Sequence, residues 1–107
     1  MLVVTRYRVS EDDVEFHPQA RVALAALAAR PGCLGGTVGR NLDEPELWLL
    51  STSWRTVGDY RRALSHPDVK VRAVPLMYRC IDEPSAYEDL TVWDPEQGTT
   101  ERASDRA

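Results

Sequence analysis

The stretch Leu-Trp-Leu-Leu-Ser-Thr-Ser-Trp, residues 47–54, has the strongest strand pattern in the chain and decides the fold. Side chains alternate between the two faces of a strand. One face therefore carries Leu47, Leu49, Ser51 and Ser53, and the other carries Trp48, Leu50, Thr52 and Trp54. A sheet covered on one side needs large apolar groups on one face only. Because this strand has them on both faces, we expect both faces to be covered.

Three more strands and two helical regions flank this strand. The other predicted strands are Leu2–Val9, Cys33–Leu42 and Tyr87–Trp93. The first predicted helix runs from Pro18 to the pair Pro31-Gly32. The second helical region begins at the cap Thr56 and breaks at Ser65-His66-Pro67, and a short helix over Val69–Val74 ends at Pro75. The order βαββαβ predicts an α+β, ferredoxin-like fold with an antiparallel sheet and helices on one face. A second copy of the chain is the simplest cover for the other face, which predicts a homodimer.

Length and composition exclude several classes of protein. A chain of 107 residues allows one domain, which we place at residues 1–93, and the polar residues 94–107 are expected to form a disordered tail. The net charge of −4 argues against a nucleic-acid partner. No apolar run is long enough to span a membrane, and the N-terminus lacks the pattern of a signal peptide, so we expect a cytoplasmic protein. Cys33 and Cys80 form neither a disulfide framework nor a metal-ligand spacing.

Three short motifs resemble those of one known family, and they occur in the family's order. Arg30-Pro31-Gly32-Cys33-Leu34-Gly35-Gly36 is similar to the turn that opens the second strand in antibiotic biosynthesis monooxygenase domains. Leu49–Trp54, followed by Thr56, Asp59 and Tyr60, resembles their third strand and the helix after it, and Ser65-His66-Pro67 resembles their helix break. The resemblance spans about Met1 to Trp93 and implies the dimeric α/β barrel.

The family includes oxygenases of aromatic polyketides that use neither metal nor flavin, and it includes haem-degrading enzymes. The haem-degrading members use an Asn in strand one, a Trp at the end of strand three and a His in the second helical region. Trp54 matches this pattern, but Thr5 and Arg6 stand at the Asn position and Val71-Arg72-Ala73 at the His position. We therefore expect no haem chemistry and no cofactor.

Five residues are candidates for a site. Trp54, Tyr60 and His66 are the catalytic candidates: Trp54 as a flat wall with an N–H donor, Tyr60 as a hydrogen-bonding phenol and His66 as a base. Tyr7 and Arg72 are candidates for binding the substrate. Each also has a purely structural reading, as a core aromatic residue, a helix-junction histidine or an exposed arginine. The sequence contains no metal-ligating cluster and no Ser-His-Asp set.

Two functions stay open at this point. The first is a cofactor-independent monooxygenase that acts on an electron-rich aromatic, polyketide-like phenol. The second is a non-catalytic dimeric module, ligand-binding or cyclase-like, with the same fold. An enclosed pocket beside Trp54 with two converging polar groups would favour the enzyme, and a filled core would favour the module.

Overall fold

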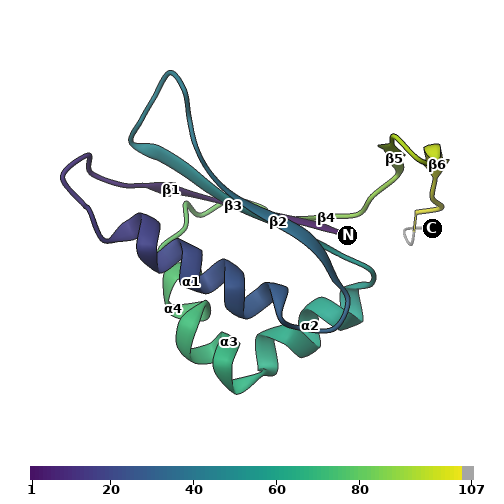
Figure 1. The fold of residues 1–107 in the computed structure, drawn as a ribbon, viewed down its shortest axis with the longest axis horizontal. Helices are drawn as coiled ribbons and strands as arrows, with labels where there is room; N and C mark the ends of the chain where they lie inside the picture. Colours follow the sequence, from purple (N-terminus) through teal and green to yellow (C-terminus); the bar gives the residue numbers. More distant parts are fainter. Residues whose placement is uncertain (105–107) are drawn as a thin grey trace.

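A computed structural model describes residues 1–104 and confirms the predicted fold class (Figure 1). The elements are, in chain order, β1 (Leu2–Arg8), α1 (Phe16–Ala28), β2 (Cys33–Arg40), β3 (Leu47–Trp54), α2 (Val57–Ser65), α3 (Pro67–Arg72), α4 (Val74–Met77), β4 (Ala86–Tyr87), β5 (Thr91–Asp94) and β6 (Gly98–Glu101). The main sheet has the order β2-β3-β1-β4 with antiparallel neighbours. The helices lie on one side of this sheet, as the ferredoxin-like arrangement requires.

The core lies between the sheet and the helical layer. On β1 the alternating residues Val3, Thr5 and Tyr7 are buried. On β3 the buried set is Leu50, Thr52 and Trp54, which shares this face because Thr5 pairs with Leu50. Small and apolar residues of α1 cover them, and these are Phe16, Ala20, Ala23 and Leu27. The alternation predicted for both strands is therefore confirmed, and α1 begins at Phe16, ahead of the expected Pro18.

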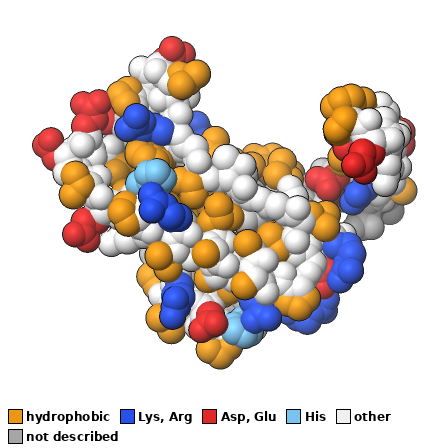
Figure 2. All heavy atoms as spheres, viewed as in Figure 1, with side chains coloured by type: hydrophobic (Ala, Val, Ile, Leu, Met, Phe, Trp, Pro, Cys, Tyr) orange, Lys and Arg blue, Asp and Glu red, His pale blue; other side chains and the backbone are white. Residues whose placement is uncertain are grey.

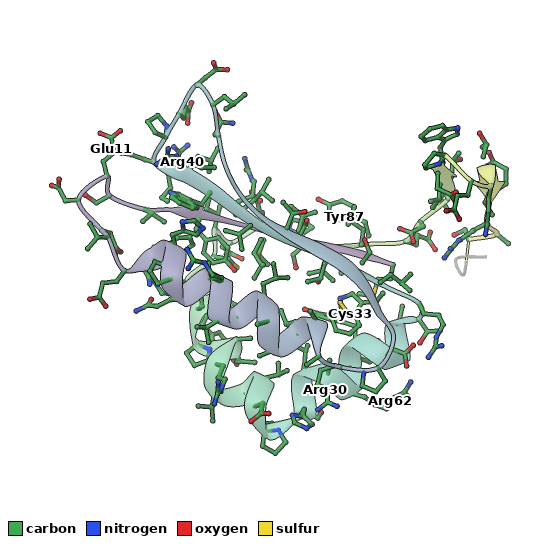
Figure 3. The ribbon with its side chains drawn as sticks, viewed as in Figure 1. Glu11, Arg30, Cys33, Arg40, Arg62 and Tyr87 are labelled. Atoms are coloured by element: carbon green, nitrogen blue, oxygen red, sulfur yellow. The ribbon has the colours of Figure 1, made fainter. Side chains whose placement is uncertain are left out.

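The opposite face of the sheet has no helix over it. Leu47 and Leu49 on β3 and Leu2 and Val4 on β1 are only half-buried there. Tyr87 of β4 pairs with Leu2 and lies on the same face, away from the helices (Figure 3). Apolar side chains thus remain open to solvent on the helix-free face of a single chain.

The turn after α1 brings the backbone against a buried carboxylate. Gly32 has a φ of +89°, and a Cβ built there would lie 2.4 Å from Cγ of Asp59. The Asp59 carboxylate accepts hydrogen bonds from Arg62 at 2.6 Å and from Arg55 at 3.3 Å. The Arg62 hydrogen bond is the largest cause that lowers the pKa of Asp59. Both the dihedral angle and the missing side chain therefore require glycine at this turn.

The helical layer after β3 consists of three short helices. The backbone N–H of Asp59 donates to Thr56 Oγ1 at 3.0 Å, which confirms Thr56 as the cap of α2. Pro67 starts α3 as predicted. The prediction that Pro75 ends a helix was wrong, because Pro75 lies in the first turn of α4, where its missing N–H leaves no intrahelical bond unmade.

The C-terminal part of the prediction needs correction. The expected strand Tyr87–Trp93 is interrupted at residues 88–90, which separate the two-residue β4 from β5. The expected disordered tail is wrong for residues 94–101, because β5 and β6 pair in a hairpin around a turn in which Gly98 has a φ of +70°. This hairpin stands apart from the body of the molecule as a separate lobe (Figure 2). Residues 105–107 of the predicted tail lie outside the described residues.

Candidate active site

A cavity of about 510 Å³ opens between β1 and the helical layer. Its apolar walls are Leu64, Val74 and Met77, from α2 and α4. Its polar groups are Thr5, Tyr60, Lys70, Tyr78, Cys80 and Ser85. The volume is in the range of sites that hold small organic ligands, and apolar walls with a few polar groups are typical of such sites.

Tyr60 presents the cavity with a free phenol. Its side chain is half-buried, and its hydroxyl forms no hydrogen bond within residues 1–104. Burial raises the pKa of Tyr60, and the neighbouring Cys80 raises it further. The phenol therefore keeps its proton at neutral pH and is available as a hydrogen-bond donor to a ligand.

Trp54 lies behind Tyr60 and does not line the cavity. Its side chain is 0% exposed, and its ring centroid is 5.5 Å from that of Tyr60. Its Nε1 donates a hydrogen bond of 2.8 Å to Thr52 Oγ1. The indole N–H, expected to donate to a ligand, is thus already used within the core, and Trp54 instead supports the ring of Tyr60.

Tyr7 does not line the cavity, but its hydroxyl is hydrogen-bonded to that of Thr5, which does. Tyr7 is 1% exposed and packs against Phe16, while Thr5 in front of it lines the cavity. Thr5 Oγ1 lies 2.7 Å from Tyr7 Oη and donates to the carbonyl of Leu50 at 3.3 Å. Because Thr5 has one proton, Tyr7 is the donor in the first contact, and the Thr5 hydroxyl can offer a ligand only an acceptor. Burial raises the pKa of Tyr7 to about 12.

The structure does not bring His66 and Arg72 into this cavity. His66 lines a different hollow together with Arg30 and Arg62, which lie close together at the outer side of the helical layer (Figure 3). Its Nδ1 accepts a hydrogen bond from the backbone N–H of Asp68 at 3.2 Å and so caps α3. Arg72 lines a further hollow between α1 and α3. His66 and Arg72 therefore do not line the cavity that contains Tyr60.

Several cavity residues were absent from the predicted site. Thr5 had a signal in the sequence, because it stands where the haem-degrading relatives have Asn. Lys70 had a weaker one, as the single lysine among 13 basic residues. Cys80 and Ser85 come from the irregular connection between α4 and β4, where no periodicity indicates which way a side chain points.

Metal sites and membrane spans were also considered for the described part of the chain. In residues 1–104, no group of three His, Cys, Asp or Glu side chains lies close enough to hold a metal ion. Across the same residues, no helix has both the length and the apolar character needed to cross a bilayer. Cys33 and Cys80 are free thiols.

Comparison with known proteins identifies related folds and a family. SnoaB, a cofactor-independent oxygenase from Streptomyces nogalater, has a similar structure with a TM-score of 0.65 and 25% sequence identity over 83% of this chain and 94% of that chain. A conserved protein from Methanosarcina mazei Go1 has a TM-score of 0.64 and 22% identity over 79% of this chain and 84% of that chain, a likeness in fold. No curated protein matches the chain significantly. The sequence model described as antibiotic biosynthesis monooxygenase matches residues 1–72, more than half of the chain. The chain therefore belongs to the antibiotic biosynthesis monooxygenase family.

Proposed function

We propose that this protein is a cofactor-independent monooxygenase that binds an aromatic, polyketide-like phenol in the cavity lined by Thr5 and Tyr60. The observation that carries the proposal is the Tyr60 hydroxyl, which has no hydrogen-bond partner within residues 1–104 and lies at the wall of a largely apolar hollow of about 510 Å³. Family membership and the similarity to SnoaB support the same reaction class.

The chemistry demands little of the protein. An electron-rich phenol that bears an activated ring CH₂ group reduces dioxygen itself once it has lost a proton. One oxygen atom then becomes a carbonyl at that carbon and the other leaves as water, so that the substrate supplies all four electrons. The protein must exclude water and stabilise negative charge on the substrate oxygen as it develops. Tyr60 supplies a donor for that charge, Thr5 an acceptor, and Trp54 holds the ring of Tyr60 in place.

The proposal includes a cytoplasmic homodimer in which the helix-free sheet faces pack together. Leu2, Val4, Leu47 and Leu49 are the half-buried apolar residues that a second copy would cover. A chain of this size has a small core of its own, so burial of this face would add stability.

Oxygen consumption by metal-free protein tests the proposal directly. Wild-type protein and anthrone-like phenols should consume one dioxygen per molecule of substrate. Tyr60→Phe should lower the rate about a hundred- to a thousandfold, because one donor to the developing charge is lost. Trp93→Phe is the control, since Trp93 is 67% exposed on the β5–β6 hairpin and does not line the cavity. No uptake above the protein-free rate would refute the function, and an unchanged rate in Tyr60→Phe would refute the site.

One observation favours the second candidate, a non-catalytic ligand-binding module. Among the cavity-lining residues of the described chain there is no carboxylate and no imidazole to take the substrate's proton. An oxygenase with this cavity would therefore need a substrate acidic enough to ionise in water, or a base from among the other polar groups of the wall, such as Cys80. Tight binding of aromatic phenols without oxygen consumption would establish the module instead.

A further inference from the structure

The β5–β6 hairpin projects beyond the main sheet on the side that has no helices. Figure 2 shows it as a lobe on one side of a hollow, and the turn between β2 and β3 projects on the other side. Among the described residues, its two strands pair with each other and not with the main sheet. The helix-free face of the sheet lies between the two projections, with the half-buried side chains of Leu2, Val4, Leu47 and Leu49. We call this surface the concave face.

The base of the hairpin is fixed to the start of β1. One oxygen of the Asp89 carboxylate accepts a hydrogen bond of 2.8 Å from the backbone ammonium of Met1. The same oxygen lies 3.6 Å from Nη1 of Arg102. The backbone N–H of Arg102 donates to the carbonyl of Leu90 at 2.8 Å, which closes the hairpin at its base. These contacts hold the hairpin at one angle to the sheet, beside the concave face.

The hairpin and the strand before it expose large apolar side chains. Tyr87 is 51% exposed, Leu90 is 49% exposed and Trp93 is 67% exposed. A two-stranded hairpin by itself is at best marginally stable in water. An aromatic side chain contributes most when its apolar area is removed from water. A further surface that covers the hairpin would therefore stabilise it.

The area of the concave face indicates what the hairpin adds to an interface. The seven residues of β1, with the neighbouring strands β2 and β3, cover roughly 23 Å by 14 Å, on the order of 300 Å². A stable interface buries about 800 Å² on each partner. Two sheet faces alone would fall well short of this area. At their exposures, Trp93 and Tyr87 add on the order of 200–300 Å², so the hairpin brings the concave face much closer to the area that a stable dimer needs.

Charge favours a second copy of the chain as the occupant. Residues 91–101 contain Asp94, Glu96 and Glu101 and no basic side chain, so nucleic acids and anionic lipids would be repelled. On the helix-free face, β1 contributes the exposed guanidinium groups of Arg6 and Arg8, each with one carboxylate partner from a loop. The acidic hairpin and the basic end of the face thus complement each other. One chain carries both surfaces, as a two-fold symmetric contact requires.

We propose that the concave face binds a second copy of the chain, and that the β5–β6 hairpin of each copy lies against the helix-free face of the other, with Trp93 in the contact. The inference deepens the homodimer of the proposed function, on which it rests for the packing of the two sheet faces. It identifies the hairpin as the segment that holds the two copies together.

Three variants test the hairpin by sedimentation velocity, from submicromolar to high micromolar concentration. Trp93→Ser should raise the Kd of the dimer at least about tenfold, because an aromatic anchor of the contact is lost. Trp93→Phe keeps an aromatic ring and should stay within about threefold of wild type. Val71→Ser is the matched control, because it removes a side chain that is 74% exposed on α3, on the helical side of the sheet. Circular dichroism at low concentration checks that each variant is folded.

Photochemical cross-linking locates the contact directly. A variant with p-benzoylphenylalanine in place of Trp93 is mixed with isotope-labelled wild type and irradiated, and mass spectrometry separates products between copies from products within one copy. The expected products join residue 93 of one copy to β1 or β3 of the other. Products confined to one copy, or joined to the helices of the other copy, would overturn the inference.

The two proposals can fail separately. A wild-type dimer that Trp93→Ser leaves unchanged would overturn the role of the hairpin, and the homodimer with packed sheet faces would stand. A wild-type monomer at every concentration would overturn both. Oxygen uptake tests the proposed reaction independently of the hairpin, because Trp93 does not line the cavity that contains Tyr60.

Discussion

Replacing Trp54 with Phe probes both the core and the site. The indole is 0% exposed and donates a hydrogen bond to Thr52, so the substitution removes buried volume and one buried bond. A loss of roughly 40 Å³ at about 24 cal/mol per Å³ destabilises the fold by about 1 kcal/mol. The lost bond, with the Thr52 hydroxyl left unsatisfied, adds about 1–2 kcal/mol. The expected loss of about 2–3 kcal/mol corresponds to a fall in Tm of roughly 10–20 °C for a domain of this size.

Thermal melts at fixed protein concentration measure this loss, and Trp93→Phe is the matched control. Trp93 is 67% exposed on the β5–β6 hairpin, so its replacement should change stability by less than about 0.5 kcal/mol. Because the Trp54 N–H is used within the core, the rate per folded molecule should fall less in Trp54→Phe than in Tyr60→Phe. A well-folded Trp54→Phe protein that melts like wild type, or that has lost more activity than Tyr60→Phe, would refute this reasoning.

Three other predictions follow from the fold. Gly32→Ala should destabilise the protein by at least about 2 kcal/mol, because the backbone is left-handed at Gly32 and the new Cβ meets Asp59. In the control Gly35→Ala the new Cβ faces open space, so the urea midpoint should shift little. Similar urea midpoints for the two variants would contradict this prediction. Burial raises the pKa of Tyr7 from 10 to about 12. The protonated Tyr7 phenol therefore contributes its full stabilisation to the fold below pH 10, and this contribution is lost as the pH rises toward 12. The free energy of unfolding of the wild type should fall by about 2–3 kcal/mol between pH 10 and pH 12, and that of Tyr7→Phe should fall less. Parallel pH profiles of the two proteins would contradict this prediction. Sedimentation equilibrium at micromolar concentration should give twice the chain mass of 12.0 kDa, and a monomer would remove the proposed homodimer.

Strand periodicity predicted the sheet because burial in the chain follows it residue by residue. In β1 and β3 every second side chain faces the helices, and the predicted alternation of Val3, Thr5 and Tyr7 is the observed one. The β5–β6 hairpin has no such signal, because Trp93 and the threonines around it are not buried in a core. A polar sequence that pairs only with itself cannot be distinguished from a disordered tail by hydrophobic pattern.

The candidate site was predictable only in part. Trp54 and Tyr60 come together because one ends β3 and the other lies in the first turns of α2, a connection too short to separate them. The placement of His66 and Arg72 depends on the angle between α2 and α3, which a break at Ser65-His66-Pro67 leaves undetermined in the sequence. The direction of the side chains that follow a helix break depends on tertiary packing, which cannot be predicted from the spacing of residues in the sequence.

The separation of the β5–β6 hairpin from the body has a consequence for amide exchange. Its backbone hydrogen bonds connect Thr91–Asp94 with Gly98–Glu101, and the exposed Trp93 covers little of them. The hairpin amides should therefore exchange with deuterium through local opening, long before those of β1 and β3, which need the whole domain to open. If a second copy of the chain covers the hairpin, those same amides will become protected as the protein concentration rises, so that exchange in this segment reports assembly without any measurement of mass.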